Sequence, residues 1–227
     1  MAPMRLIVLG LALVLALSAC SPRAALWTGA EGASPSIADR AARATVALRD
    51  GPARWPQIPS GCGVMISRRE ILTAGHAVKN GGGLQVELHD GSLRWARVVR
   101  SFGGPADATG PLDAPVLRDL AVLRLDDGEG GTSHWMPIAD RDPARGSLVL
   151  IVGAPEGAVG AVVTGVVSQI RGIDGLVIGA HLEPGWSGGP VVNSHGELVG
   201  LVSRGRESVA LAVPASAIRA GLRKMSR

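Results

Sequence analysis

Short apolar runs alternate with turn-forming residues along most of the chain. The runs are rich in Val, Leu, Ile and Ala, and Gly, Pro, Asp or Ser residues lie between them. Runs of this length and composition, bounded in this way, are typical of β-strands. The predicted strands are 45–49, 62–67, 70–74, 84–89, 93–100, 120–125, 147–152, 161–170, 176–181, 190–193, 197–203 and 208–213. About twelve short strands predict an all-β protein, built as a sandwich or as a pair of barrels.

The chain predicts a helix only at its C-terminal end. Pro214 can open this helix, and one apolar face would carry Ala215, Ile218, Leu222 and Met225. Residues 102–118 contain Gly, Pro and Asp without any periodicity, so we expect a long surface loop there. Tight hairpin turns are expected where Asp-Gly pairs separate two strands, at Asp90-Gly91 and Asp174-Gly175.

The N-terminal segment has the pattern of an export signal. A short positive segment, 1–5, precedes an apolar run, 6–17, that is too short for a permanent membrane-spanning helix. The next residues, Leu-Ser-Ala-Cys ending at Cys20, resemble the lipobox of bacterial lipoproteins. This resemblance implies a signal peptide over 1–19, lipidation of Cys20, and a location at the outer membrane facing the periplasm, because Ser21 follows the cysteine. The alternative is an ordinary signal peptide in which Cys20 is incidental.

Composition and charge narrow the class of protein further. The 32 glycines and 15 prolines are too many for a helical bundle, and with 3% aromatic residues the core must consist mainly of aliphatic side chains. The net charge of +4 is scattered rather than clustered among aromatics, so we expect no nucleic-acid partner. Residues 20–36 are rich in Ala, Gly, Ser and Pro and predict a flexible tether. If Cys20 is acylated, Cys62 has no partner for an intramolecular disulfide.

Three fragments carry candidate chemistry. The fragment ILTAGHAV places His76 at the end of an apolar run, LRDLAVLRL places Asp119 before one, and PGWSGGPVV places Ser187 in a glycine-rich turn. A serine hydroxyl is a weak nucleophile that needs a base within hydrogen-bond reach and a third group to orient that base. Histidine and aspartate are the usual choices. Asp113 is a weaker candidate for the third group, because no strand follows it in its Pro-rich loop.

The glycines around the serine predict a second function of the turn. Gly185 and Gly188 permit positive φ angles, which can turn the amide N–H groups of Gly185 and Ser187 toward one point. Such a point can stabilise the oxyanion of a tetrahedral intermediate.

In the order His, Asp, Ser, these motifs resemble the chymotrypsin-fold serine proteases, and among them the bacterial trypsin-like and HtrA-type members. The resemblance extends over about residues 40–218. It implies two six-stranded antiparallel β-barrels, over 37–135 and 136–227, with the site in the cleft between them and the crossing near 126–145. It also implies that Ser187 attacks the substrate carbonyl, His76 transfers the proton and Asp119 orients the imidazole.

The same resemblance suggests residues that bind the substrate. The strand segment with Ser203, Arg204 and Gly205 is similar to the one that pairs with the substrate backbone. His181 matches the base of the specificity pocket, where no acidic residue stands, so a preference for Arg or Lys is not expected. We expect the pocket to bind a small or apolar side chain of the substrate. An acidic substrate side chain is the alternative, because His181 and Arg204 could bind it. The alternative is that neither residue binds the substrate. His181 would then be a polar residue with hydrogen-bond partners in the protein, and Arg204 a charged loop residue exposed to water.

Two positions depart from the family pattern. Trp186 stands where the digestive members have an aspartate, so their activation switch cannot operate, and the ring could fill a pocket or distort the oxyanion turn. Cys62, within Gly-Cys-Gly, is expected to be a buried, inert thiol.

The first hypothesis is therefore an exported, monomeric serine endopeptidase that acts on proteins or peptides. The alternative is a protease-fold binding or scaffold protein with little activity, because of Trp186. No cofactor is predicted. No metal site is predicted either, because His89, His134 and His195 lack neighbours at ligand spacing.

Overall fold

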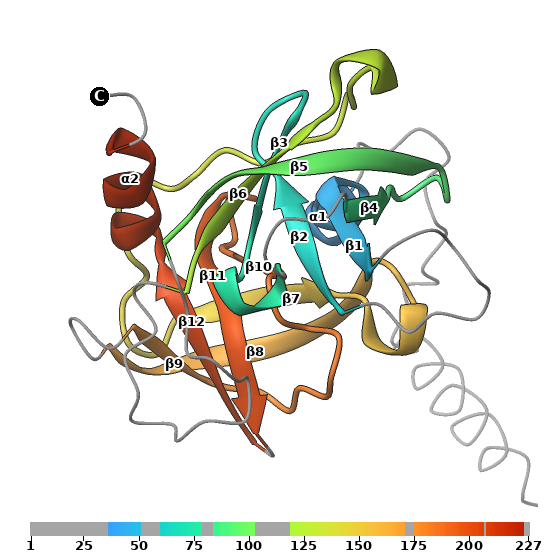
Figure 1. The fold of residues 1–227 in the computed structure, drawn as a ribbon. Helices are drawn as coiled ribbons and strands as arrows, with labels where there is room; N and C mark the ends of the chain where they lie inside the picture. The colour runs from blue at the N-terminus through green and yellow to red at the C-terminus, as the bar shows by residue number, and fades with distance from the viewer. Residues whose placement is uncertain are drawn as a thin grey trace, which may run out of the picture. The chain divides into compact units, whose positions relative to one another are not determined.

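Two closed six-stranded barrels form the body of the protein (Figure 1). The computed structural model describes residues 36–50, 60–78, 84–102, 119–170, 175–206 and 208–224. The strands of the first barrel are β1 (Thr45–Asp50), β2 (Gly61–Met65), β3 (Glu70–Thr73), β4 (Leu84–Glu87), β5 (Leu93–Ser101) and β6 (Ala121–Leu125). Those of the second are β7 (Leu148–Gly153), β8 (Ala161–Ile170), β9 (Leu176–Gly179), β10 (Pro190–Val192), β11 (Leu198–Arg206) and β12 (Val209–Pro214).

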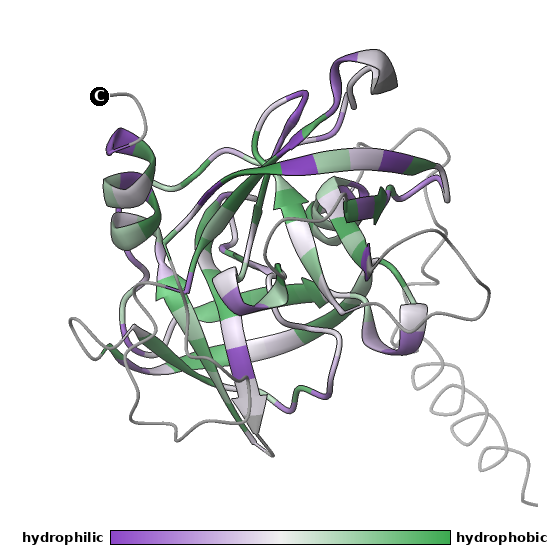
Figure 2. Cartoon of the chain, in the orientation of Figure 1, coloured by the Kyte–Doolittle hydropathy of each residue, from purple (hydrophilic) through white to green (hydrophobic). Residues whose placement is uncertain are grey.

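Each barrel closes through antiparallel pairs. The strand order is β1-β2-β3-β6-β5-β4 in the first barrel and β10-β11-β12-β9-β8-β7 in the second. Each of the twelve predicted runs corresponds to one strand, and the predicted pair of six-stranded antiparallel barrels is confirmed. Most strand segments are apolar, as the green colour in Figure 2 shows. The expectation of a hairpin turn at Asp90-Gly91 is also confirmed, since Gly91 has a φ of +77° between the paired strands β4 and β5.

The prediction that only the C-terminal end is helical is wrong. A helix, α1 (Ile37–Ala44), precedes the first strand, and Ser36 and Asp39 close a capping box at its start. The Asp39 amide donates to the Ser36 hydroxyl at 3.1 Å, and the Asp39 carboxylate accepts from the Ser36 amide at 3.1 Å. These two bonds satisfy amide groups that an uncapped helix would leave without partners. The predicted C-terminal helix is present as α2 (Ala215–Arg223), with Pro214 at its N-cap.

Four apolar clusters hold the described residues together. One lies inside each barrel, a third joins the barrels, and a small fourth packs Ala47 and Cys62 of the first barrel against Ala154, which follows β7. The third cluster takes side chains from α1, both barrels and α2, among them Ala44, Leu72, Leu120, Leu198, Leu201 and Ile218. Residues between the barrels are therefore as deeply buried as those inside them.

Several predicted features lie outside the described residues. They are the signal segment with Cys20, the tether up to residue 35, nearly all of the 102–118 loop with Asp113, Asp174 and Met225. In the part of the chain that is described, no helix has the length and apolar character needed to cross a membrane.

Candidate active site

The sheet register of the first barrel brings His76 and Asp119 together. Strands β3 and β6 are antiparallel neighbours, with Thr73 opposite Ala121. Residues just beyond the end of β3 therefore lie beside those just before β6. His76 is in the short 3-10 helix Gly75–Ala77, and its Nδ1 lies 2.8 Å from Asp119 Oδ2, while its backbone amide donates to Oδ1 at 3.0 Å.

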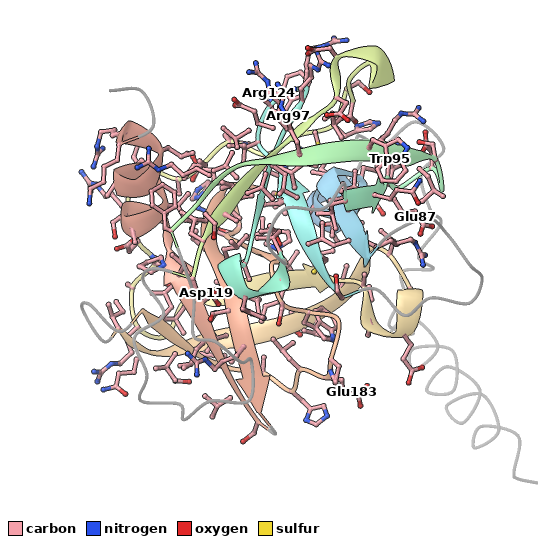
Figure 3. The ribbon with its side chains drawn as sticks, in the orientation of Figure 1. Glu87, Trp95, Arg97, Asp119, Arg124 and Glu183 are labelled. Atoms are coloured by element: carbon pink, nitrogen blue, oxygen red, sulfur yellow. The ribbon has the colours of Figure 1, made fainter. Side chains whose placement is uncertain are left out.

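The Asp119 side chain, labelled in Figure 3, is fully buried, and its carboxylate accepts hydrogen bonds from two residues. Besides the two bonds from His76, the Ser203 hydroxyl on β11 donates to Oδ2. A buried carboxylate requires such donors, because it loses its hydration. Since a carboxylate only accepts, Nδ1 of His76 carries the proton, which leaves Nε2 of the neutral ring as an acceptor.

Ser187 joins this network from the second barrel. Its hydroxyl donates to the Ser203 carbonyl at 3.2 Å, and its own carbonyl accepts the Cys62 amide of β2 at 2.7 Å. A Cβ at Gly61 would lie 2.9 Å from the Ser187 carbonyl oxygen and 3.2 Å from the Cβ of Ala77, which follows the histidine. The serine turn and the histidine segment therefore meet at the junction of the barrels, and hydrogen bonds connect Ser187 through Ser203 and Asp119 to His76.

Two glycines shape the turn around the serine. Gly185 and Gly188 have φ angles of +101° and +85°, in the region that side-chain-bearing residues rarely adopt. A Cβ at Gly188 would lie only 1.9 Å from the Cys62 carbonyl oxygen, and one at Gly185 would lie 2.7 Å from the Ala154 carbonyl oxygen. Both positions therefore require glycine for two separate reasons, backbone conformation and space.

The predicted substrate-binding residues differ in burial. The His181 side chain is 71% exposed, and its Nε2 lies 3.8 Å from the Glu183 carboxylate. Arg204 is only 2% exposed, so the alternative of a solvated loop charge is wrong for this residue. A Cβ at Gly205 would lie 2.7 Å from the Leu182 Cβ, so the buried side chain of Leu182 packs directly against Gly205.

The Cys62 thiol is buried and free, as expected. Burial raises the pKa of the thiol to about 12. Its sulfur lies 3.5 Å from the Trp186 carbonyl oxygen and 3.4 Å from that of Ser187. The side chain of Trp186 is also buried, within the apolar cluster of the second barrel.

Sequence reasoning missed two of these contacts. It assigned Ser203 to substrate binding alone, although the hydroxyl of Ser203 contacts Asp119. It also gave no role to Cys62 beside the serine turn. No local pattern marks either contact, because the partners are far apart in the chain. Among the described residues, no group of three or more His, Cys, Asp or Glu side chains could hold a metal ion.

Comparisons with known proteins agree with this geometry. The model of the trypsin-like peptidase domain matches residues 61–201. A probable periplasmic serine endoprotease, DegP-like, from Rhizobium meliloti is 34% identical over 161 residues, which cover 64% of this chain and 29% of that protein. The serine endoprotease DegS from Escherichia coli is 31% identical over 150 residues, covering 62% of this chain and 38% of that protein.

The fold comparison gives the same result. A crystal structure of the serine endoprotease from Yersinia pestis superposes with a TM-score of 0.65 and 27% identity, over 85% of this chain and 68% of that one. The chain spans about a third of the length of the curated relatives described above. The family match covers more than half of the chain, and it includes the segments that carry His76, Asp119 and Ser187. This chain belongs to the trypsin-like peptidase domain family.

Proposed function

We propose that this protein is a serine endopeptidase that hydrolyses peptide bonds through Ser187, His76 and Asp119. The observation that carries the proposal is the hydrogen-bond path from the Ser187 hydroxyl, through Ser203 and the buried Asp119, to Nδ1 of His76. A base whose tautomer is fixed by a buried carboxylate, beside a hydroxyl in a tight glycine-rich turn, is the arrangement that activates a serine.

The reaction would proceed through an acyl-enzyme. Nε2 of His76 takes the Ser187 proton while Oγ bonds to the substrate carbonyl carbon, and the carbonyl oxygen becomes an oxyanion. The proton then passes to the amide nitrogen, the C–N bond breaks, and the amine leaves. Water attacks the ester in the same way, which releases the acid and returns the proton to Ser187. The amides of Gly185 and Ser187 would stabilise both oxyanions.

The resting hydroxyl must turn before this reaction. Ser187 donates to the Ser203 carbonyl at 3.2 Å, so its proton faces β11. Rotation about the Cα–Cβ bond would move the hydroxyl toward Nε2 of His76. Hydrogen bonds of a catalytic site are often longer or differently aligned before a substrate binds.

The substrate would bind as an extended strand along 203–205. Strand β10 pairs with β11 as far as Leu201, and Val202 forms backbone hydrogen bonds with Gly188 and Gly189 on the same edge, whereas β12 continues to pair with β11 through Arg206. Among the described strands, none pairs with this edge of β11 beyond Val202, and a peptide can add there. Leu182 beside Gly205 supports a small or apolar side chain at the cleavage site.

We also infer export to the cell envelope and acylation at Cys20, with attachment to the outer membrane. The support is the N-terminal sequence pattern together with the periplasmic location in the printed name of the Rhizobium meliloti relative. A protein anchored in this way would cleave proteins or peptides that reach the membrane surface. We expect the protease to be a monomer.

Labelling with a fluorophosphonate probe tests the enzyme hypothesis, because such a probe modifies only an activated serine. We expect the wild-type protein to be labelled and Ser187→Ala to remain unlabelled. His76→Ala should abolish labelling while the thermal melt changes little. Ser194→Ala, at a serine in the turn between β10 and β11, is the control and should react like the wild type.

Two results would contradict the hypothesis. If the wild-type protein is not labelled, the scaffold alternative holds instead. If His76→Ala collapses the melt, the histidine has a structural role rather than a catalytic one.

A further inference from the structure

We infer that the Trp186 side chain, packed on Gly153, is the positioning residue that sets the oxyanion turn. The inference rests on the proposed function, because it concerns the donors of the same site. Trp186 lies between Gly185 and Ser187, whose amides are the proposed donors. The backbone angles of Gly185 and Trp186 together therefore determine how the two amides are oriented relative to each other, and Trp186 is the one of the pair with a side chain that can be anchored.

The indole ring is anchored in the interior of the second barrel. Trp186 is only 5% exposed and belongs to the apolar cluster of that barrel, together with residues such as Ile151 and Val199. A buried ring loses side-chain freedom and packs at close to crystal density, so its Cα is held within narrow limits. The ring therefore lies inside the barrel and not at its surface.

The Trp186 ring packs directly against Gly153, at the end of β7. A Cβ at this position would lie 2.5 Å from Cε3 and 2.8 Å from Cδ2 of Trp186. These distances are shorter than any ordinary carbon contact, so the ring lies flush against the backbone of β7 and leaves no space for a methyl group. The φ angle of Gly153 is not in the left-handed region, so space rather than conformation requires glycine here.

The same end of β7 also holds the backbone on the other side of the turn. The Ala154 amide donates to the Gly185 carbonyl at 3.2 Å. The Trp186 carbonyl accepts the Gly189 amide at 3.0 Å, and the Cys62 sulfur lies 3.5 Å from it. The peptide groups on both sides of Trp186 therefore have fixed partners, and the ring fixes the residue between them.

This arrangement differs from that of the digestive proteases, in which an aspartate at this position takes part in the activation switch. The ring packs within an apolar cluster and against the backbone of Gly153, and this hydrophobic contact forms when the barrel folds. We therefore expect the turn to be set as soon as the second barrel is folded, without proteolytic activation.

A double-mutant cycle in the full-length protein tests the inference, with the second-order rate of fluorophosphonate labelling as the readout. Trp186→Ala should slow labelling by about ten-fold or more, because displaced oxyanion donors lose transition-state stabilisation. On a peptide substrate, kcat should fall while KM changes little. Trp186→Phe should restore most of the rate, because a ring again fills the space. Trp135→Ala, at a tryptophan that is 47% exposed, is the control and should label at the wild-type rate.

Substitution of Gly153 tests the contact between the Trp186 ring and the backbone of β7. Gly153→Ala should slow labelling by about ten-fold in the wild-type background, where its methyl group meets the ring, and should have little effect in Trp186→Ala. If Trp186→Ala does not fold, Gly153→Ala is compared in the Trp186→Phe background instead. There it should slow labelling less than it does in the wild-type background. The final extent of labelling and the thermal melt distinguish a folded variant that reacts slowly from a variant that is partly unfolded.

The possible failures are distinguishable. A wild-type protein that is not labelled overturns the proposed function and this inference with it. A labelled wild type with a folded Trp186→Ala variant that reacts at the same rate overturns the inference alone. So does an equal effect of Gly153→Ala in the two backgrounds.

Discussion

Cys62 illustrates how a single residue connects the barrels. Its amide donates to the Ser187 carbonyl, and its carbonyl accepts the Thr73 hydroxyl at 2.7 Å. The residue thus bridges the nucleophile turn of the second barrel and strand β3 of the first. Its thiol is enclosed by the same contacts, which is why burial raises the pKa to about 12.

We expect the Cys62 thiol to be unreactive in the folded protein. Because the pKa is about 12, only about one thiol in ten thousand is ionised at pH 8, and the thiolate is the reactive form. A disulfide reagent applied to the Cys20→Ser variant should give no reaction under native conditions and one thiol per chain in urea. Rapid reaction of the native protein would mean that the nucleophile turn opens readily.

At the residue scale, motifs could predict the reactive groups but not all of their partners. His76, Asp119 and Ser187 each lie in a short recognisable fragment, and the structure places the first two in contact. The bond from Ser203 to Asp119 joins residues 84 positions apart. Its existence depends on how the two barrels pack against each other, which no local pattern specifies.

At the scale of elements, the strands were predictable because each contains a short apolar run between turn residues. Helix α1 was not, because it has eight residues and buries only Ala41 and Ala44. So short a segment gives little periodicity, and alanines contribute little apolar signal. The informative pattern was the serine three residues before an acidic residue, at Ser36 and Asp39.

The cap makes a measurable contribution to the fold. Ser36→Ala should lower the free energy of unfolding by about 0.5–2 kcal/mol, because the Asp39 amide loses its acceptor. Urea unfolding followed by circular dichroism would measure this difference. Ser133→Ala is the matched control, at an exposed serine in the segment that connects β6 to β7, and it should change the free energy of unfolding little. Equal midpoints for the two variants would show that α1 docks without the help of its cap.

At the scale of the whole described body, the site exists only where the barrels meet. His76 and Asp119 come from the first barrel, and Ser187 and Ser203 come from the second. The apolar cluster between the barrels therefore has a functional consequence, since loosening it separates the two halves of the network. Stability and activity should then depend on the same contacts.

Leu201 gives a direct test of this dependence. It lies in the cluster between the barrels and is fully buried, so Leu201→Ala should lower the free energy of unfolding by about 2–5 kcal/mol. Leu148→Ala makes the same chemical change at a side chain that is 71% exposed, and it should cost far less. If the barrels unfold as one unit, circular dichroism and fluorophosphonate labelling should be lost at the same urea concentration in both variants. Labelling that disappears well before the secondary structure would instead mean that the barrels separate while each remains folded, and that the interface is the weakest part of the molecule.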